Sequence, residues 1–412
     1  MAVAIRPYQQ AGVDFLVSKR HALLGDDMRL GKSMQAILAA EVVGAQDVIV
    51  VCPAIAVPHW RRELERWWPE RTAKNIGWFV CSYDRARGSE RDYILGLKWD
   101  LVIVDECHFA KNPEAKRTKL IYGKEGLGWR AERMWVLSGT PAPKHAGELW
   151  CMLRAFGAVG MTYAEFVNRY CTVNDFTGRI TGTNVARIPE LKQILAGVML
   201  RRTRKQVAPD MPDIGFNFLE VKPASASGYA IPAGLDDDQL LEWVEAHAVV
   251  DTKDRQEVAL AKVPALVEEI VFAIENGLLA QTVVFGWHVA PLQELVRTLT
   301  ANSIRAALIT GATPARERER VLTDFREGRL QVVGANILAA GTATDMSAAR
   351  HGYFLELCWV PGVNVQAANR LVSMEKDDPV TFDVCTWPGS TDDRVQQVLV
   401  KRMAQLKEMG LA

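Results

Sequence analysis

Short, uninterrupted apolar runs alternate with amphipathic stretches along this chain, and that rhythm limits the possible folds more than any other feature. Val48–Cys52, Leu101–Val104 and Met134–Leu137 are such runs in the first half of the sequence. Each has the length of a strand that is buried on both faces, and polar residues follow it directly. The pattern predicts an α/β fold with a mainly parallel sheet, in which ligands lie at the carboxyl ends of the strands.

The rhythm is interrupted once and then restarts. The stretch 214–255 contains many Pro, Gly, Ser and Asp residues, whereas strand-like runs return at 283–285, 306–309, 331–333 and 352–355. A chain of 412 residues also exceeds what one hydrophobic core usually supports. We therefore expect an N-terminal lobe over 1–213, a linker over 214–255 and a C-terminal lobe over 256–412.

The amino-acid composition excludes several classes of protein, but it does not by itself identify the class to which this chain belongs. Lys and Arg total 49, as do Asp and Glu, so no net charge attracts the chain to nucleic acid, which only local basic clusters can bind. The seven cysteines form no C-x-x-C pair, which favours reduced thiols in the cytosol over disulfides or a zinc site. Apolar runs stay well short of the roughly 20 residues that cross a bilayer, so we expect no membrane segment.

The residues from Gly25 to Ser33 read GDDMRLGKS and fit the pattern G-x-x-x-x-G-K-[ST] before a helical stretch. In such a loop the backbone amides bind phosphate oxygens, Lys32 neutralises the β and γ phosphates, and the Ser33 hydroxyl reaches Mg²⁺. A chance Gly-Lys-Ser turn is the alternative for this motif taken alone. The residues expected around the nucleotide are Asp27, Met28, Arg29, Leu30, Gly31, Lys32 and Ser33.

Two adjacent carboxylates, Asp105 and Glu106, follow the apolar run at 101–104, and His108 comes two residues later. Phosphoryl transfer needs a clamped metal ion and an oriented water molecule. We expect Asp105 to bind Mg²⁺ with Ser33, and Glu106 to polarise the attacking water. A solvated acidic strand end is the alternative. His108 is expected to couple the nucleotide site to the next loop.

That loop, Leu137–Pro141, reads LSGTP and follows another strand-like run. The three elements, in this order, resemble motifs I, II and III of the superfamily-two helicases. The sequence RPYQ at 6–9 resembles the Q motif of the same superfamily. This resemblance implies that the adenine end of ATP is bound by Arg6, Tyr8 and Gln9.

Later segments resemble one branch of that superfamily more specifically. The sequences ELW at 148–150, FVNRYC at 166–171 and MLRRTRKQV at 199–207 are similar to the Swi/Snf family, closest to its annealing-helicase branch. The resemblance implies two RecA-like lobes, each a mainly parallel sheet flanked by helices, with a helical insertion after motif III. It also implies nucleic-acid contacts at Pro53, Ala54, Thr140, Arg202, Lys205 and Thr310. A solvated helix face is the alternative for the basic residues at 201–205.

The second half of the chain resembles motifs IV to VI. Gly341 lies where motif V couples nucleotide and nucleic acid, and QAANR at 366–370 matches the start of motif VI. The resemblance implies that Arg370 supplies charge to the γ phosphate.

Several positions depart from the family pattern. Arg29 and Ala343 stand where the family usually has Gly, and Ser373 stands where motif VI has a second Arg. An arginine finger is worth about 10³-fold or more in turnover. We therefore expect a working but slow enzyme, unless Lys376 or Arg350 compensates.

The resemblance implies an ATP- and Mg²⁺-dependent DNA translocase that moves on, remodels or reanneals duplex or branched DNA. A strand-separating DNA or RNA helicase is one alternative, and a nucleic-acid clamp with weak ATPase activity is another. DNA is expected over RNA as the partner, the chain is expected to be monomeric, and no membrane partner is expected. A compact motor of this kind suits a prokaryotic or phage genome and the cytoplasm, or the nucleus in a eukaryote.

Overall fold

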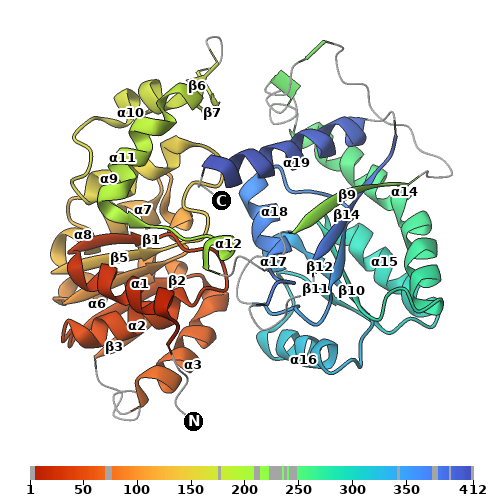
Figure 1. The fold of residues 1–412 in the computed structure, drawn as a ribbon, viewed down its shortest axis with the longest axis horizontal. Coiled ribbons are helices and arrows are strands. Elements are labelled where there is room, and N and C mark those ends of the chain that lie inside the picture. The colour runs from red at the N-terminus through yellow and green to blue at the C-terminus, as the bar shows by residue number, and fades with distance from the viewer. Residues whose placement is uncertain are drawn as a thin grey trace. The chain divides into compact units, whose positions relative to one another are not determined.

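The protein forms two compact units, residues 1–208 with 409–412 and residues 209–408. The computed structural model describes residues 5–69, 77–174, 178–207, 214–221, 234–235, 239–240, 248–340, 344–373, 379–388 and 391–409. Both units are α/β structures in which helices cover a six-stranded parallel sheet (Figure 1). Within the described ranges, no helix is long and apolar enough to cross a membrane.

The sheet of unit 1 has the strand order β3-β2-β4-β5-β1-β8, and all its neighbouring strands are parallel. Its strands are β1 (His21–Leu24), β2 (Val48–Cys52), β3 (Trp78–Ser82), β4 (Leu101–Asp105), β5 (Arg133–Leu137) and β8 (Met199–Leu200). The three apolar runs expected in this half are β2, β4 and β5. Their aliphatic residues are buried because helices pack on both faces of the sheet.

Helices follow the strands of unit 1 as a parallel sheet requires. They are α1 (Pro7–Ser18), α2 (Lys32–Val42), α3 (Val57–Trp67), α5 (Tyr83–Arg87), α6 (Arg91–Gly96), α7 (Lys116–Tyr122) and α8 (Leu127–Arg130). Short 3₁₀ turns precede or interrupt them at η1 (Ala54–Ala56) and η2 (Cys107–Ala110).

The insertion after β5 is largely helical, as expected. It contains η3 (Ala146–Leu149), α9 (Trp150–Ala155), α10 (Tyr163–Tyr170), η4 (Val185–Arg187) and α11 (Ile188–Val198), and after β8 the chain forms α12 (Arg204–Val207). A small antiparallel hairpin, β6 (Cys171–Val173) with β7 (Ile180–Thr183), was not anticipated from the sequence.

Unit 2 contains a second parallel sheet with the order β11-β12-β10-β13-β14-β9. Its strands are β9 (Gly215–Glu220), β10 (Thr282–Gly286), β11 (Ala306–Ile309), β12 (Val332–Asn336), β13 (His351–Phe354) and β14 (Thr381–Thr386). Its helices are α14 (Ala248–Glu275), α15 (Val289–Ala301), α16 (Ala315–Arg326), α17 (Ile337–Ala340), α18 (Pro361–Ala368) and α19 (Thr391–Met409).

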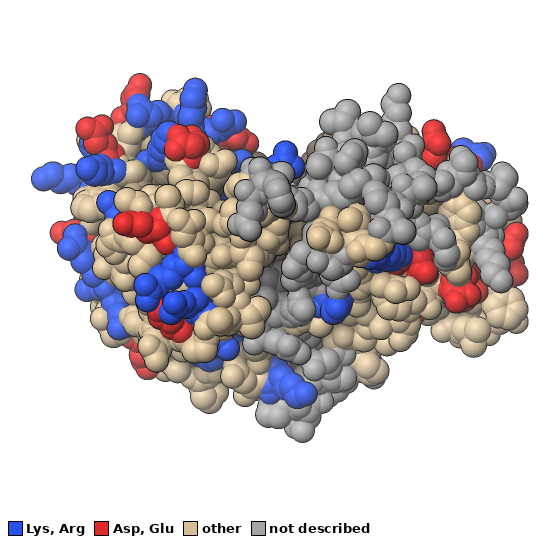
Figure 2. All heavy atoms as spheres, turned by 90° about the horizontal axis from the view of Figure 1, so that it is seen from above, with Lys and Arg blue, Asp and Glu red and all other residues tan. Residues whose placement is uncertain are grey.

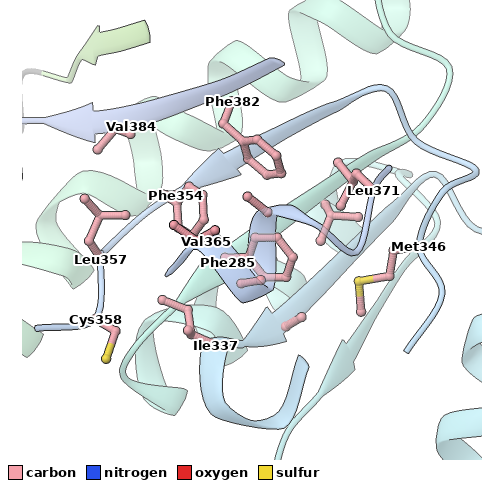
Figure 3. Close-up of a cluster of buried hydrophobic side chains, with 14 of the residues drawn as sticks. Phe285, Ile337, Met346, Phe354, Leu357, Cys358, Val365, Leu371, Phe382 and Val384 are labelled. Atoms are coloured by element: carbon pink, nitrogen blue, oxygen red, sulfur yellow. The ribbon is translucent and has the colours of Figure 1, made fainter. Parts of the chain in front are cut away.

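Three aromatic rings from neighbouring strands form the centre of the core of unit 2 (Figure 3). Phe354 lies between the other two in the sheet, with its ring centroid 5.3 Å from that of Phe285 and 5.1 Å from that of Phe382. Phe285 and Phe354 are paired in the register, whereas Phe382 lies beside Gly352, and the three rings pack in one core with residues of α18.

The segment 214–255, expected to be a linker, is partly built into the second sheet. Residues Gly215–Glu220 form β9, which pairs along its whole length with β14, and α14 already begins at Ala248. The sequence pattern concealed the strand because β9 lies at the sheet edge, where Phe218 and other residues remain exposed.

Candidate active site

Three loops meet at the carboxyl edge of the sheet of unit 1. The register sets Leu24 of β1 beside Leu137 of β5, and Leu137 beside Asp105 of β4. The residues that follow these three positions are therefore neighbours, and they belong to the GDDMRLGKS loop, the Asp105-Glu106 pair and the LSGTP loop. The sheet thus brings together the three elements that lie far apart in the sequence.

The GDDMRLGKS loop leads into helix α2, which begins at Lys32. Gly31 is the N-cap with φ +79°, and no side chain caps the helix, so its first amides face the loop without an intrahelical partner. The Lys32 ammonium donates to the carbonyl oxygens of Asp26 at 2.8 Å and Asp27 at 3.2 Å. An uncapped helix N-terminus beside a lysine is a suitable environment for phosphate oxygens.

Asp105 and Glu106 are held by several hydrogen bonds. The Trp60 indole N–H donates to Asp105 Oδ2 at 2.8 Å, and the Glu106 backbone N–H donates to Asp105 Oδ1 at 3.0 Å. The Tyr83 hydroxyl donates to the Asp105 carbonyl at 2.8 Å and supports the turn at Glu106, whose φ is +50°. Burial and the neighbouring Glu106 carboxylate raise the pKa of Asp105, while Trp60 and the Lys32 charge oppose this shift.

Glu106 also contacts the LSGTP loop. The Ser138 hydroxyl donates to Glu106 Oε2 at 3.3 Å, and His108 Nδ1 lies 3.2 Å from the same hydroxyl oxygen. Burial lowers the pKa of His108 to about 3, with the nearby Lys111 charge adding to the effect. His108 is therefore neutral at neutral pH and joins the acidic pair to this loop, in agreement with the expectation for it.

The RPYQ segment lies beside the phosphate loop. Gln9 accepts a hydrogen bond from the Arg6 backbone N–H at 3.0 Å and lies 3.5 Å from the Leu30 carbonyl through Nε2. A Cβ at position 31 would come within 2.8 Å of the Gln9 amide, so glycine is needed there for close packing. Tyr8 is half-buried, and burial raises the pKa of its hydroxyl. Adenine recognition by these residues stays a prediction.

The residues expected to contact nucleic acid do not all have suitable surroundings. Arg202 is bound to the buried Asp26 carboxylate, with its Nε 2.9 Å from Oδ1, and also donates to Gln35 Oε1 at 2.9 Å and to the Tyr8 carbonyl. Its guanidinium holds the GDDMRLGKS loop, and the DNA contact expected for it stays a prediction. Thr140 is only 1% exposed, and the contact expected for it stays a prediction as well.

The remaining expected contacts lie on loops and helix ends. Ala54 is exposed after buried Pro53, and Lys205 is exposed on α12. Thr310 follows β11, where its carbonyl accepts from Arg318 at 3.0 Å. Figure 2 shows basic side chains in small groups, some of them beside acidic ones, on the face drawn.

Arg370 lies just after α18 in unit 2 and is 8% exposed. Its backbone carbonyl accepts a hydrogen bond from Met346 at 3.1 Å, which anchors the segment after the helix. Ser373 is described, whereas Gly341 and Lys376 lie outside the described residues. The roles expected for Arg370 and Gly341 stay predictions.

A buried ionic cluster that the sequence did not reveal lies at the carboxyl ends of β10 and β13. His288 Nδ1 is 2.6 Å from Glu356 Oε1, and the Arg255 guanidinium lies 3.8 Å from the centre of the Trp359 ring. Burial alone would raise the pKa of Glu356, but the hydrogen bonds from His288 and the charge of Arg255 outweigh it and lower the pKa. The cluster fixes the loop that leads into α18.

The residues of unit 1 fit a nucleotide with Mg²⁺. Mg²⁺ takes oxygen ligands and usually keeps water and phosphate oxygens in addition to one or two protein ligands. Asp105 and Ser33 supply a carboxylate and a hydroxyl, and each Asp105 oxygen retains a lone pair beside its one hydrogen bond. Among the described residues there is no group of three or more His, Cys, Asp or Glu that could hold a metal ion.

Comparison with family models matches both halves of the chain. The SNF2-related domain matches residues 8–78 and 70–227, which is more than half of the sequence. The chain belongs to the SNF2-related family. The helicase conserved C-terminal domain matches residues 261–374. These matches confirm the predicted Swi/Snf resemblance and the enzyme class, a helicase-type ATPase.

Individual relatives of this SNF2-related chain are distant in sequence. It is 26% identical to the SWI/SNF-related matrix-associated actin-dependent regulator of chromatin subfamily A-like protein 1 of Xenopus tropicalis, over 99% of this chain and 45% of that protein. It is also 26% identical to the DNA annealing helicase and endonuclease ZRANB3 of Bos taurus, over 97% of this chain and 40% of that protein. The chain therefore spans less than half the length of these relatives.

A solved structure is similar as well. The Sulfolobus solfataricus SWI2/SNF2 ATPase core in complex with dsDNA is 19% identical to this SNF2-related chain. The similarity covers 99% of this chain and 93% of that chain, with a TM-score of 0.46.

Several residues of the site escaped sequence reasoning. In the sequence Trp60 cannot be distinguished from a packing residue, and nothing singles out Tyr83, Gln35 or Asp26 as partners of the site. The order of the strands is needed to find them, because their contacts join segments up to 176 residues apart.

Proposed function

We propose that this chain couples ATP hydrolysis in unit 1 to translocation on duplex or branched DNA. The observation that carries the proposal is the register that sets Leu24, Leu137 and Asp105 side by side. This register places the GDDMRLGKS loop, the Asp105-Glu106 pair and the LSGTP loop at one edge of the sheet. Rewinding or remodelling of DNA is the task that the annealing-helicase relatives favour.

The residues of unit 1 have separate tasks in this proposal. Lys32 exchanges its two carbonyl partners for the β and γ phosphate oxygens, and Ser33 with Asp105 holds the metal ion. Bound Mg²⁺ would neutralise charge that develops on the phosphates. Glu106 accepts a proton from the attacking water, while the Ser138 hydroxyl keeps its carboxylate oriented.

Residues of unit 2 also have roles in the proposed function. Arg370 of unit 2 is proposed to supply charge to the γ phosphate during hydrolysis. Because Ser373 replaces a second arginine, turnover is expected to be slow. Exposed groups such as Ala54, Lys205 and the Thr310 loop are proposed to contact the DNA backbone.

Steady-state ATPase measurements test the proposal with a panel of nucleic acids. Duplex DNA and forks should stimulate hydrolysis more than single-stranded DNA or RNA, and the effect should weaken with salt because phosphate contacts release counterions. Preferential stimulation by single strands or RNA would instead support a strand-separating helicase. Salt must therefore be held constant across the panel.

A pair of glutamate substitutions tests the chemistry. Glu106→Gln should lower DNA-stimulated turnover by about 100-fold or more while nucleotide binding persists. Glu125→Gln, at an exposed position of the same unit, is the control and should leave turnover intact. If neither the parent nor the Glu106 variant releases phosphate in response to DNA, the motor is refuted. A nucleic-acid clamp, suggested by Ser373, then remains.

A further inference from the structure

Trp60 gives its indole N–H to the carboxylate that is expected to bind magnesium. The side chain is fully buried on the first turn of α3, and its N–H donates to Asp105 Oδ2 at 2.8 Å. The other oxygen, Oδ1, accepts from the Glu106 backbone at 3.0 Å. A donor on each oxygen sets the rotation of the carboxylate, and so the direction of its remaining lone pairs.

Two other buried tryptophans of this unit donate to backbone carbonyls. Trp99 donates to the Ile94 carbonyl at 2.8 Å, and Trp135 donates to the Lys19 carbonyl at 3.2 Å. A backbone carbonyl is therefore sufficient for a buried indole N–H, although Trp67 of helix α3 donates to the Glu63 carboxylate at 3.1 Å. The Trp67–Glu63 bond stays within one helix, whereas the Trp60 bond joins α3 to β4 and to the carboxylate that is expected to bind magnesium, which points to a role beyond filling the core.

The helix that carries Trp60 also presents positive charge to solvent. Arg61 and Arg62 follow Trp60 directly and are exposed, because successive residues of a helix point about 100° apart. Helix α3 begins just after Ala54, one of the proposed contacts with the DNA backbone. One face of a single three-turn helix thus contacts Asp105, while another offers cations to phosphates.

We propose that Trp60 is a positioning residue that links DNA contact at α3 to the orientation of the Asp105 carboxylate. A hydrogen bond of 2.8 Å weakens steeply with distance and angle, so a small shift of α3 on binding DNA changes how Asp105 is held. The ring of Trp60 is packed in the core of unit 1. This inference rests on the proposed ATP-driven function of the same site.

Trp60→Phe removes the N–H and keeps an aromatic ring, and Trp135→Phe is the matched control. Both tryptophans are fully buried in the same core. The Trp135 N–H, however, donates to the Lys19 carbonyl just before β1, at the amino ends of the strands and away from the candidate site. Calorimetric titration with ADP, with and without Mg²⁺, measures the metal dependence of nucleotide binding. ATPase assays with and without duplex DNA measure the stimulation ratio, and thermal unfolding compares stability.

For Trp60→Phe we expect unchanged ADP affinity without Mg²⁺ and an enhancement by Mg²⁺ that falls about tenfold, as for other groups that orient a metal ligand. The stimulation by duplex DNA should fall as well. Trp135→Phe should lose comparable thermal stability with neither effect. Full Mg²⁺ enhancement in Trp60→Phe, or an equal loss in Trp135→Phe, overturns the proposal.

A surface variant covers the case in which Trp60→Phe does not fold. Arg61→Gln combined with Arg62→Gln alters only exposed side chains and should lower both the stimulation by duplex DNA and its salt dependence. Undiminished stimulation overturns the link through α3. If the unsubstituted chain shows no DNA stimulation, the proposed function fails, while the ADP titration still decides whether Trp60 positions Asp105.

Discussion

Removal of the Arg202 guanidinium should destabilise unit 1 strongly. Asp26 is fully buried, and Arg202 contacts both of its oxygens, with Nε 2.9 Å from Oδ1. In Arg202→Met the carboxylate would keep only the backbone N–H of residue 202 at 3.1 Å and the Gln35 amide at 3.3 Å. Breaking a buried ion pair in this way costs about 3–5 kcal/mol.

Partial access of water places the expected loss toward the lower part of that range. The Arg202 side chain is 13% exposed, so solvent can reach part of the space that it leaves. The variant Asp26→Asn with Arg202→Met contains no unpaired charge and should recover about 1–2 kcal/mol of the loss. Urea titrations at pH 7 of the parent, the two single variants and the double variant form a double-mutant cycle, which gives the coupling free energy between Asp26 and Arg202.

A loss below about 1 kcal/mol for Arg202→Met would refute this reasoning, because it would mean that the ion pair contributes as little as an exposed one. The guanidinium would then be available for a phosphate, as the sequence first suggested. DNA binding distinguishes the two roles, since loss of a phosphate contact lowers the salt dependence of affinity by about one counterion.

Three further predictions concern packing, backbone strain and pH. Gly12→Ala should cost about 1–3 kcal/mol in thermal unfolding, because the new Cβ would lie 1.7 Å from Gln35 Oε1, whereas Gly160→Ala meets nothing within 4 Å and should be neutral. Arg29→Gly should change the free energy of unfolding by less than about 1 kcal/mol, because relief of the backbone strain at φ +69° is offset by the greater freedom of glycine in the unfolded chain. A larger loss would show that side-chain contacts of Arg29 outweigh the strain. His108 binds a proton more readily when unfolded, because its folded pKa is lowered to about 3, so stability should fall as pH drops below 6.5, by at most about 2 kcal/mol at pH 5. His108→Asn should flatten this dependence in urea titrations at pH 7 and pH 5, and an unchanged slope would contradict it.

The parts of the fold that the sequence predicted are those with local signals. Buried strands such as β2 and β4 contain the continuous apolar runs 48–52 and 101–104, and the GDDMRLGKS loop is a contiguous motif, so each is visible within about ten residues. The edge strand β9 was missed because a half-exposed strand has no such run. The same locality makes Lys32 and the Asp105-Glu106 pair recognisable as candidates, each within its own motif.

The parts that the sequence did not predict depend on contacts between distant segments. The basic run at 201–205 looks the same whether it faces solvent or an acidic partner, and only the pairing of β1 with β8 brings Arg202 to Asp26. Trp60 is likewise indistinguishable from a packing tryptophan until β2 and β4 are seen as neighbours. The hydrogen-bond partners of Arg202 and Trp60 therefore follow from the order of the strands in the sheet.

The pairing of β9 with β14 determines how this chain can be divided for expression. A fragment that starts at residue 256, the boundary suggested by composition, would lack β9 and leave the backbone amides and carbonyls of β14 unpaired at an open edge. Such edges recruit strands from other molecules, so this fragment should aggregate. A fragment that starts at residue 209 keeps all six strands and is the better candidate for a soluble, separately folding half.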